Sequence, residues 1–386
     1  MELTFTPQQN AFREQVRKFL VAEVTDDLLA RTGAVTEHHD EVFYQKLAKK
    51  GWLGMQWSER HGGQGRSHLE LVIFIEEMAY ALAPLGRYVG TVIFLGESLL
   101  AYGSEWQRQH FLPKIALGEM TSSLCLTEPD AGSDAAALRT RAEEQGGDFY
   151  LSGQKTFISG ADHSSYGMVV ARTAPPTSKK TEGISIFLVD LSSPGVEILP
   201  LWTIADWKVY QVFFDKVRVP ANMLMGRKNE GWKHIVKETL NFERSSMKRV
   251  GTAARMCDDL FSFVREAKRH GETISQSLLH ELVELKTEIE SWRVMSYRIA
   301  WLQSRGEIPG PETSMVKLAS SEGILRLANL GMDIIGHAGR LRSGTETLPG
   351  RIEWMYRAAQ FHITAGGTSE IQRNVIARLA LDLPRA

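Results

Sequence analysis

Glu243 is the side chain in this sequence best suited to take a proton from a substrate. It is the only charge on the apolar face of a helix expected after Asn229. A carboxylate in an apolar stripe is either paired with a buried cation or kept for proton chemistry, because burial without a partner raises its pKa and costs stability. An ion pair with Arg244, or with another arginine of a bundle, stays open as the alternative. The rest of this face is expected to be Trp232, Val236, Leu240, Met247, Val250, Ala254, Cys257, Phe261 and Val264.

A second candidate is the stretch Leu124–Asp134, where a short apolar run changes abruptly into a polar loop. Pro129 restricts the residue before it to an extended conformation, and Gly132 allows the backbone to approach another group closely. Peptide N–H groups and the Thr127 and Ser133 hydroxyls then converge on one polar ligand. The pattern predicts a strand that ends in a ligand-binding loop, with an ordinary polar turn as the alternative.

A third candidate lies near the C-terminus, where the stretch 361–372 contains two adjacent glycines before a helical pattern. Gly366 and Gly367 can bring backbone N–H groups close to an anion or the edge of a cofactor. Thr368 and Glu370 are suited to cap and charge the start of the final helix. The same residues also fit a normal helix start without a ligand.

Three stretches of different periodicity must position these residues. Apolar residues recur at helical spacing from Pro7 to about Gly118. Short β-branched and aromatic runs, without helices between them, follow up to about Arg227 and favour an antiparallel sheet over a Rossmann unit. From Asn229 onward, two stripes of about 25–30 residues, separated by the turn at 306–311, predict antiparallel helices. The expected fold is α+β, with an N-terminal helical domain (1–118), a middle antiparallel β domain (119–228) and a C-terminal antiparallel helix bundle (229–386). The expected strands are residues 149–159, 166–173, 183–190, 196–201 and 210–219.

Composition excludes several classes of protein. The net charge of −1 argues against a nucleic-acid partner, and no run approaches the roughly 18 apolar residues of a membrane span. The N-terminus lacks a signal-peptide pattern, so we expect a cytoplasmic, bacterial protein. Cys125 and Cys257 are expected to be buried free thiols, and His280 begins a zinc-like motif that lacks its second histidine, so no metal site is expected. The glycine-rich loop at 62–65 lacks a preceding strand and is expected to be a flexible connector.

Four spaced motifs resemble the acyl-CoA dehydrogenase family. They read Leu-Thr-Glu-Pro-Asp-Ala-Gly-Ser-Asp at 126–134, Gly-Gln-Lys-Thr-Phe-Ile-Ser at 153–159, Val-Phe-Phe-Asp-Lys-Val-Arg-Val-Pro at 212–220 and Gly-Gly-Thr-Ser-Glu-Ile-Gln at 366–372. They follow the family's order over nearly the whole chain. The resemblance implies a helical, β and helical domain, in agreement with the periodicity.

The resemblance also implies a chemistry: a flavoprotein that removes the α-proton and a β-hydride from an acyl-CoA thioester and gives the trans-2-enoyl-CoA. FAD would accept the hydride, because no side chain can, while the protein supplies a base and polarises the thioester carbonyl. An electron-transfer flavoprotein would then take the electrons. The implied substrate-binding residues are Ser133, Asn241, Arg244 and Gly367. The implied flavin-binding residues are Leu124, Leu126, Thr127, Gly132, Ser133, Phe157, Ile158, Ser159, Thr368 and Glu370.

The chain departs from the family pattern at the base. Most members carry the catalytic Glu immediately before the Gly-Thr of the C-terminal loop, and here that place is Gly366. The isovaleryl and long-chain branches carry it instead on a helix, at a Glu-Arg pair that corresponds to Glu243–Arg244. The resemblance thus assigns the α-proton to Glu243, the residue already singled out by its apolar surroundings.

A second departure concerns the adenine end of FAD, which in the family is completed by the neighbouring subunit. The usual Arg followed by an aromatic is at best Arg269 followed by Glu272, and the usual Gln-x-x-Gly-Gly appears as Asp-Ile-Ile-Gly-His at 333–337. This is similar to bacterial enzymes for bulky substrates, including steroid side-chain CoA esters, some of which pair two different chains. A homodimer or homotetramer and a heterotetramer therefore both stay open. Alternative outcomes are a non-catalytic or partly catalytic subunit of such a heteromer, an oxidase and a desulfinating enzyme.

Overall fold

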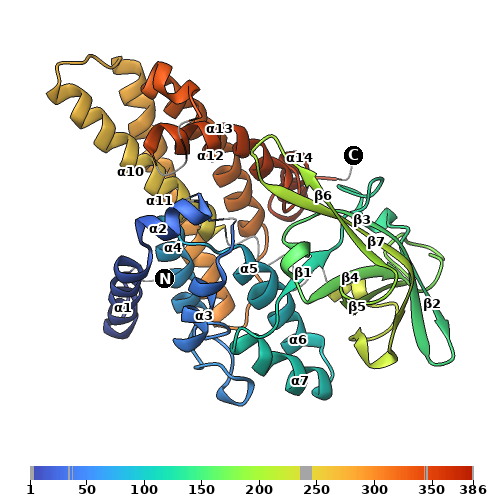
Figure 1. Cartoon of the computed structure of the whole chain (residues 1–386). Helices are drawn as coiled ribbons and strands as arrows, with labels where there is room; N and C mark the ends of the chain where they lie inside the picture. Colours follow the sequence, from blue (N-terminus) through green and yellow to red (C-terminus); the bar gives the residue numbers. More distant parts are fainter. Residues whose placement is uncertain are drawn as a thin grey trace. The chain divides into compact units, whose positions relative to one another are not determined.

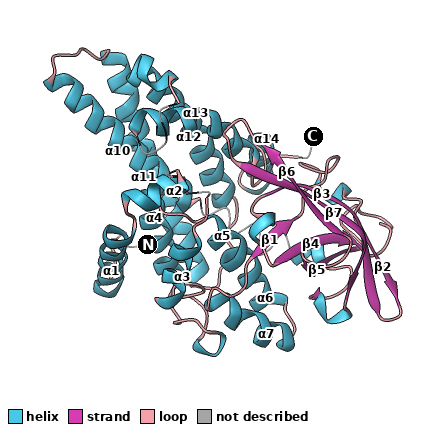
Figure 2. Cartoon of the chain, in the orientation of Figure 1, coloured by secondary structure: helices cyan, strands magenta, loops and turns pink. Residues whose placement is uncertain are grey.

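The computed structural model describes residues 4–33, 35–36, 38–234, 246–342, 344 and 347–384. The chain forms two compact units. The first contains Met1–Phe43, Arg66–Leu85 and Arg244–Ala386, and the second contains Tyr44–Gly65 and Gly86–Glu243. All strands of the described residues belong to the second unit (Figures 1 and 2). The boundaries of the three expected domains stay a prediction.

The first unit is built around helix α4 (His68–Tyr80), which packs against α1 (Pro7–Glu23), α10 (Met247–Arg269) and α11 (Gln276–Ser304). The starts of α1 and α4 follow from the sequence, because Thr6 with Gln9 and Ser67 with Glu70 form capping boxes. Helix α12 (Glu312–Ile335) packs against α11, α13 (Leu348–Thr364) and α14 (Ser369–Leu379). Two shorter elements complete the unit: α2 (Asp26–Thr32) and the 3₁₀ turn Gly336–Arg340.

Two buried carboxylates hold α4 to its neighbours. Glu76 accepts hydrogen bonds from Arg13 of α1 (3.0 Å) and from Arg293 and Tyr297 of α11. Glu77 accepts from Arg17 of α1 (2.9 Å). Buried carboxylates are stable only when paired, so this network fixes the register of α1 and α11 on α4.

The second unit combines helices with a sheet. Its helices are α5 (Gly86–Tyr88), the π-helical segment Val89–Gly96, α6 (Glu97–Tyr102), α7 (Glu105–Ala116) and α8 (Gly231–His234), with a 3₁₀ turn at Glu59–His61. Helix α3 (Glu41–Lys49) begins in the first unit and ends in the second.

The sheet is mostly antiparallel, as expected. Its strand order is β6-β7-β3-β2-β4-β5-β8, and β1 pairs with β4. Two pairings, β1 with β4 and β2 with β4, are parallel. The apolar side chains of the strands form one buried cluster with Phe149, Leu151, Phe187, Val212 and Phe214 near its centre. The strands are β1 (Ser122–Cys125), β2 (Arg141–Gln145), β3 (Asp148–Ile158), β4 (Tyr166–Arg172), β5 (Ile184–Asp190), β6 (Val196–Trp202), β7 (Lys208–Val219) and β8 (Leu224–Met225).

Strand β2 was not expected from the sequence. It reads Arg-Ala-Glu-Glu-Gln, and only Ala142 within it is buried. It lacks the β-branched and aromatic residues typical of strands. A two-residue turn at Gly146–Gly147 pairs β2 with β3, with Gln145 opposite Asp148. The extended conformation of β2 is therefore set by the hairpin and not by the strand propensity of its residues.

The glycine-rich loop at 62–65 is not a flexible connector, because it is packed against Trp57. A Cβ atom on Gly63 would lie 2.1 Å from the Trp57 carbonyl oxygen. Trp57 is 2% exposed, and its Nε1 donates to Glu97 Oε1 at 2.9 Å. Gly63 thus allows the chain to pass directly over the main chain of Trp57.

The first prediction concerns this contact. Gly63→Ala is expected to lower the free energy of unfolding by about 1–3 kcal/mol, because the clash is with backbone, which cannot move aside as a side chain can. Gly132→Ala is the matched control, since a Cβ atom there meets nothing within 4 Å. The measurement is chemical unfolding of the flavin-free protein. Equal stability of the two variants would contradict the prediction.

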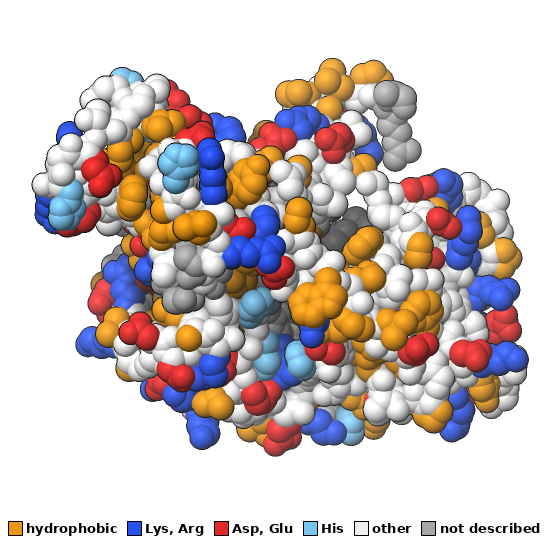
Figure 3. All heavy atoms as spheres, turned by 45° about the horizontal axis from the view of Figure 1, so that its top comes forward, with side chains coloured by type: hydrophobic (Ala, Val, Ile, Leu, Met, Phe, Trp, Pro, Cys, Tyr) orange, Lys and Arg blue, Asp and Glu red, His pale blue; other side chains and the backbone are white. Residues whose placement is uncertain are grey.

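The surface carries charges of both signs. On the face drawn in Figure 3, lysine and arginine side chains lie among aspartates and glutamates, in line with the net charge of −1. In the described ranges, every helix is too short or too polar to cross a membrane. Both cysteines are free and buried, as expected, and burial raises the pKa of each thiol to about 12.

Candidate active site

The loop after β1 is held in place by the buried side chain of Glu128. The carboxylate accepts hydrogen bonds from the backbone N–H groups of Arg139 (2.5 Å) and Thr140 (2.9 Å) and from Lys155 Nζ (2.8 Å). Glu128 also pairs its backbone with Ala131, at 3.3 and 3.1 Å, which closes the turn around Pro129. The loop is therefore an ordered structure with its own polar core.

Lys155 of β3 is the second member of this core and is fully buried. Its ammonium donates to Glu128 Oε1 and to the backbone oxygen of Leu126 (3.0 Å). Burial by itself raises the pKa of the Glu128 carboxyl, but the Lys155 charge and the hydrogen bonds from Lys155, Thr140 and Arg139 outweigh it and lower that pKa. Glu128 and Lys155 thus form a charged pair inside the second unit.

The edge formed by Phe157–Ser159 lies against the same loop. The N–H of Thr156 donates to the backbone oxygen of Thr127 at 2.9 Å. Between Lys155 and Ile158, β3 has one residue more than the facing segment of β7, so the strand bulges there. The structure therefore brings the expected residues 124–133 and 157–159 together in one unit.

Phe157 combines two unusual properties. Its backbone has φ of 57°, and its side chain is 66% exposed. A bulky aromatic residue is rarely found in this region, and strained backbone of this kind is concentrated at binding sites. The neighbouring Ile158 is 2% exposed and belongs to the sheet core, so only its backbone is available to a ligand.

The remaining expected residues of this loop provide a mixed lining. Leu124, Leu126 and Thr127 are half-buried, whereas Gly132, Ser133 and Ser159 are exposed. This loop and the end of β3 thus combine apolar side chains, an exposed aromatic ring and hydroxyl groups. Such a lining is suited to a flat, partly polar group such as a flavin. FAD, as the resemblance implies, is thus compatible with the residues present.

The C-terminal loop belongs to the first unit. Gly366 and Gly367 have φ of 70° and 89°, and Thr368 caps α14 by accepting a hydrogen bond from the N–H of Ile371 (3.3 Å). Hydrogen bonds with its own N–H and the Thr368 side chain lower the pKa of Glu370. The expected helix cap is confirmed.

Three expected site residues, Glu243, Asn241 and Arg244, lie outside the described residues. On either side of them, α8 ends at His234 and α10 begins at Met247. Ser246 has φ of 57°, so a helix cannot continue through it from Met247. The single uninterrupted helix expected from Trp232 to Val264 is therefore wrong at this point.

Glu128 and Lys155 were missed as functional candidates. A pattern was available for Lys155, because the alternation that places Phe149 and Leu151 on the inner face of β3 also places Lys155 there. Glu128 gave no comparable pattern, since two of its partners are backbone N–H groups eleven and twelve residues further along the chain and the third, Lys155, lies 27 residues further along.

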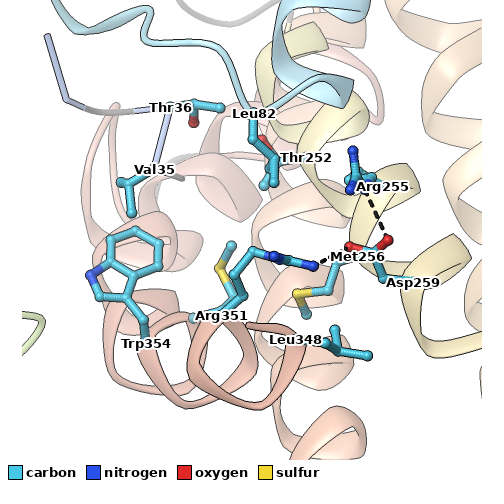
Figure 4. A pocket seen from close by; sticks show the side chains of 11 residues that line it. Val35, Thr36, Leu82, Thr252, Arg255, Met256, Asp259, Leu348, Arg351 and Trp354 are labelled. Carbon is cyan, nitrogen blue, oxygen red and sulfur yellow. Dashed lines mark hydrogen bonds and ion pairs between the residues drawn. The ribbon is translucent and has the colours of Figure 1, made fainter. Parts of the chain in front are cut away.

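A recess in the first unit is lined by described residues that are not among those expected at the site (Figure 4). Its two arginines both donate to Asp259, Arg255 at 2.9 Å and Arg351 at 3.0 Å. The charged groups at its wall are thus paired with one another, as the dashed lines show. The remaining wall is mostly apolar and consists of Val35, Thr36, Leu82, Thr252, Met256, Leu348, Trp354 and Met355.

Comparison with known protein families accounts for the whole arrangement. Residues 6–119 match the acyl-CoA dehydrogenase N-terminal domain, residues 123–217 the middle domain and residues 229–381 the C-terminal domain. The chain belongs to the acyl-CoA dehydrogenase family. It is therefore an oxidoreductase and a flavoprotein, and its cofactor is FAD.

Similar acyl-CoA dehydrogenases align over the whole chain. Acyl-CoA dehydrogenase FadE26 of Mycobacterium tuberculosis is 31% identical, and the match covers 100% of both chains. Acyl-CoA dehydrogenase IpdE1 of the same organism is 34% identical, with 97% of each chain covered. Among solved structures, the Tcur3481-Tcur3483 steroid ACAD has a TM-score of 0.90 at 29% identity and full coverage of both chains.

Gly132→Ala gives the second prediction, because it separates binding from folding in this acyl-CoA dehydrogenase. Stability is expected to stay within about 0.5 kcal/mol, since the added Cβ atom meets nothing within 4 Å. If the loop faces the flavin as expected, a methyl group at position 132 prevents close approach, and the Kd for FAD is expected to rise about tenfold, which corresponds to about 1.4 kcal/mol. Fluorescence titration of the flavin-free protein measures this. An unchanged Kd would remove Gly132 from the flavin contacts.

Proposed function

We propose that the chain catalyses the α,β-dehydrogenation of an acyl-CoA thioester to the trans-2-enoyl-CoA. The observation that carries this proposal is the match of all three family domains, in order, along one chain. FAD, when bound, supplies the acceptor for the β-hydride. Every other part of the chemistry falls to residues of this chain.

Glu243 is proposed as the base that takes the α-proton. Gly366 has no side chain to do so, although it stands where most family members carry their catalytic Glu. Removal of the α-proton leaves negative charge on the thioester oxygen, and backbone N–H donors favour it. Asn241, Arg244, Ser133 and Gly367 are proposed to bind the CoA substrate.

Two groups of residues are proposed to hold FAD. In the second unit they are Leu124, Leu126, Thr127, Gly132, Ser133, Phe157, Ile158 and Ser159. The support for this group is the exposed, strained Phe157 beside a loop with free hydroxyl-bearing side chains. In the first unit they are Thr368 and Glu370, supported by the glycine-rich turn that precedes α14.

A bulky acyl group is proposed as the substrate, with steroid side-chain CoA esters as one class to test. The name of the Tcur3481-Tcur3483 steroid ACAD supports their inclusion. An electron-transfer flavoprotein is the proposed electron acceptor, and a cytoplasmic location is proposed with it.

An acyl-CoA panel tests the function directly. Short, branched and steroidal esters are mixed with the flavin-loaded protein without oxygen, and the loss of visible flavin absorbance is followed. We expect bleaching with at least one bulky ester and formation of the enoyl-CoA. No bleaching with any ester would refute the dehydrogenation. Oxygen consumption without another acceptor would instead indicate an oxidase, and release of sulfite from a sulfinate-bearing substrate a desulfinating enzyme.

A specific observation favours a second candidate, a subunit that completes the site of a different chain. Arg269, in the place of the usual adenine-end arginine, is paired with Glu266 at 2.9 Å, and Glu272 replaces the usual aromatic. This chain is then a poor donor of flavin contacts to an identical neighbour. The mass of the complex isolated from its source, together with the flavin content per chain, decides between a homo-oligomer and a heterotetramer.

A further inference from the structure

Lys155 and Lys317 are the lysines with buried side chains in the described part of the chain, at 0% and 1% exposure. Lysine is almost never fully buried, because removing an ammonium group from water is costly. Both donate to a backbone oxygen of a loop near the expected site: Lys155 to Leu126 and Lys317 to Gly367. The role of Lys155 follows from its carboxylate partner, whereas Lys317 needs an explanation of its own.

Lys317 and Gln372 together hold the turn before α14. Lys317 Nζ lies 2.6 Å from the Gly367 oxygen. The side-chain amide of Gln372, which is fully buried, donates to the oxygens of Gly366 (2.9 Å) and Gly367 (3.4 Å). Two consecutive carbonyl groups are thus directed toward these two buried donors.

The direction of the carbonyl groups determines the direction of the following N–H groups. No peptide bond of the described chain is cis, and in a trans peptide the N–H points opposite to the carbonyl. The N–H groups of Gly367 and Thr368 therefore point away from Gln372 and Lys317. Neither N–H donates a hydrogen bond to any described residue. Successive unpaired N–H groups at the start of a helix form a site for an anion or a polar ligand edge.

The conformation of the turn depends on the hydrogen bonds from Lys317 and Gln372, because its two glycines do not by themselves restrict the backbone to one conformation. Gly366 and Gly367 have positive φ, and glycine samples many other conformations at little cost. A Cβ atom on Gly367 would lie 2.6 Å from Gln372 Nε2, so the amide packs directly on the turn. A charge-assisted hydrogen bond from Lys317 is the strongest of the contacts that select one orientation.

We propose that Lys317 is a positioning residue for FAD, which fixes the Gly367 carbonyl so that the Gly367 and Thr368 N–H groups are presented to the cofactor. This rests on the assignment of Thr368 to the flavin under the proposed function. Lys317 acts through the main chain and does not touch the cofactor itself.

Lys317→Met tests this, because it keeps the apolar stem and removes the ammonium group. Flavin-free protein is examined in two ways: hydrogen–deuterium exchange of the peptide covering 366–371, and FAD affinity by fluorescence titration. We expect faster exchange of the Ile371 amide, which donates to the Thr368 side chain of this turn, and a rise of about tenfold or more in the Kd for FAD. Ser321→Ala is the matched control, since Ser321 is buried one turn further along α12 and donates only to Leu318 within its own helix. It is expected to leave the Kd within about twofold.

Two further variants keep the test decisive. If Lys317→Met does not fold, Lys317→Gln retains N–H donors without the charge and is expected to give an intermediate Kd. Gln372→Met removes the second side-chain donor to the Gly367 oxygen. Its effect on the Kd for FAD is expected to be non-additive with that of Lys317→Met, because both side chains act on one peptide group. A Kd unchanged in Lys317→Met, or raised equally in Ser321→Ala, would overturn the proposal. Neither measurement uses acyl-CoA, so the effect of Lys317→Met on FAD binding can be interpreted even if the chain does not catalyse the dehydrogenation.

Discussion

Glu243→Gln is expected to abolish the bleaching of flavin by acyl-CoA while FAD stays bound. Glutamine has nearly the same shape as glutamate but accepts no proton at neutral pH, so the α-proton has no base. General-base catalysis typically contributes about 10²–10⁴-fold, and a loss of that size in the rate of flavin reduction is expected. Anaerobic stopped-flow mixing with the best ester of the panel measures the rate, and the flavin spectrum before mixing reports occupancy.

Glu238→Gln is the matched control, because Glu238 lies in the same stretch of sequence but is not one of the residues expected on the apolar face. It is expected to reduce flavin at the rate of the unmodified protein. A Glu243→Gln variant that bleaches at the full rate would remove Glu243 from the mechanism. Gly366 has φ of 70°, and a glutamate at this position would carry a backbone strain of about 1–2 kcal/mol.

Lys155→Met is expected to lower the free energy of unfolding by about 3–5 kcal/mol. The change leaves the Glu128 carboxylate buried without its counter-charge, and breaking a buried ion pair from one side is strongly destabilising. The Glu128→Gln/Lys155→Met double variant, which has no buried charge, is expected to be more stable than Lys155→Met alone. Chemical unfolding of the flavin-free proteins measures these stabilities, and adding the Glu128→Gln single variant and the unmodified protein completes the cycle that gives the coupling between the two residues.

Lys180→Met is the control for this pair, because Lys180 also binds a carboxylate of the same region, Asp134, at 2.7 Å. That pair is exposed, so its loss is expected to cost at most about 1 kcal/mol. A loss in Lys155→Met no larger than in Lys180→Met would contradict the buried-pair interpretation. Because the folded protein lowers the pKa of Glu128, the stability from this pair is present at neutral pH and is lost as the pH falls through that lowered pKa.

The fold could be predicted where burial follows a regular period. The stripes of α11 and α12 and the core positions of β3, β5 and β7 are continuous patterns, and the structure confirms a helical region, an antiparallel sheet and C-terminal helices. Strand β2 was not predicted, because its pairing is set by a turn and not by the residue types of the strand. The loop at 62–65 was misjudged because its glycines are needed by Trp57, a contact that periodicity does not reveal.

The candidate site could be predicted only as far as its loops. Side-chain composition pointed to Thr127, Ser133 and Thr368, and the acyl-CoA dehydrogenase motifs added Phe157; their contact with a ligand stays a prediction. The buried side chains that hold these loops in place, Glu128, Lys155 and Lys317, were not predicted, because they hydrogen-bond to backbone atoms distant in sequence. Strain at Phe157 is likewise a property of the assembled strand and not of its residue type.

The Glu128 network also bears on which changes the loop after β1 can accept. It grips the loop by main-chain atoms, namely the Leu126 oxygen and the Arg139 and Thr140 N–H groups, and leaves exposed side chains such as Asp130 and Ser133 outside the network. Replacing those side chains therefore leaves the loop path intact, whereas inserting or deleting a residue between 128 and 139 would pull the carboxylate off its donors. Variant libraries of this loop are therefore best designed with constant length and variable side chains.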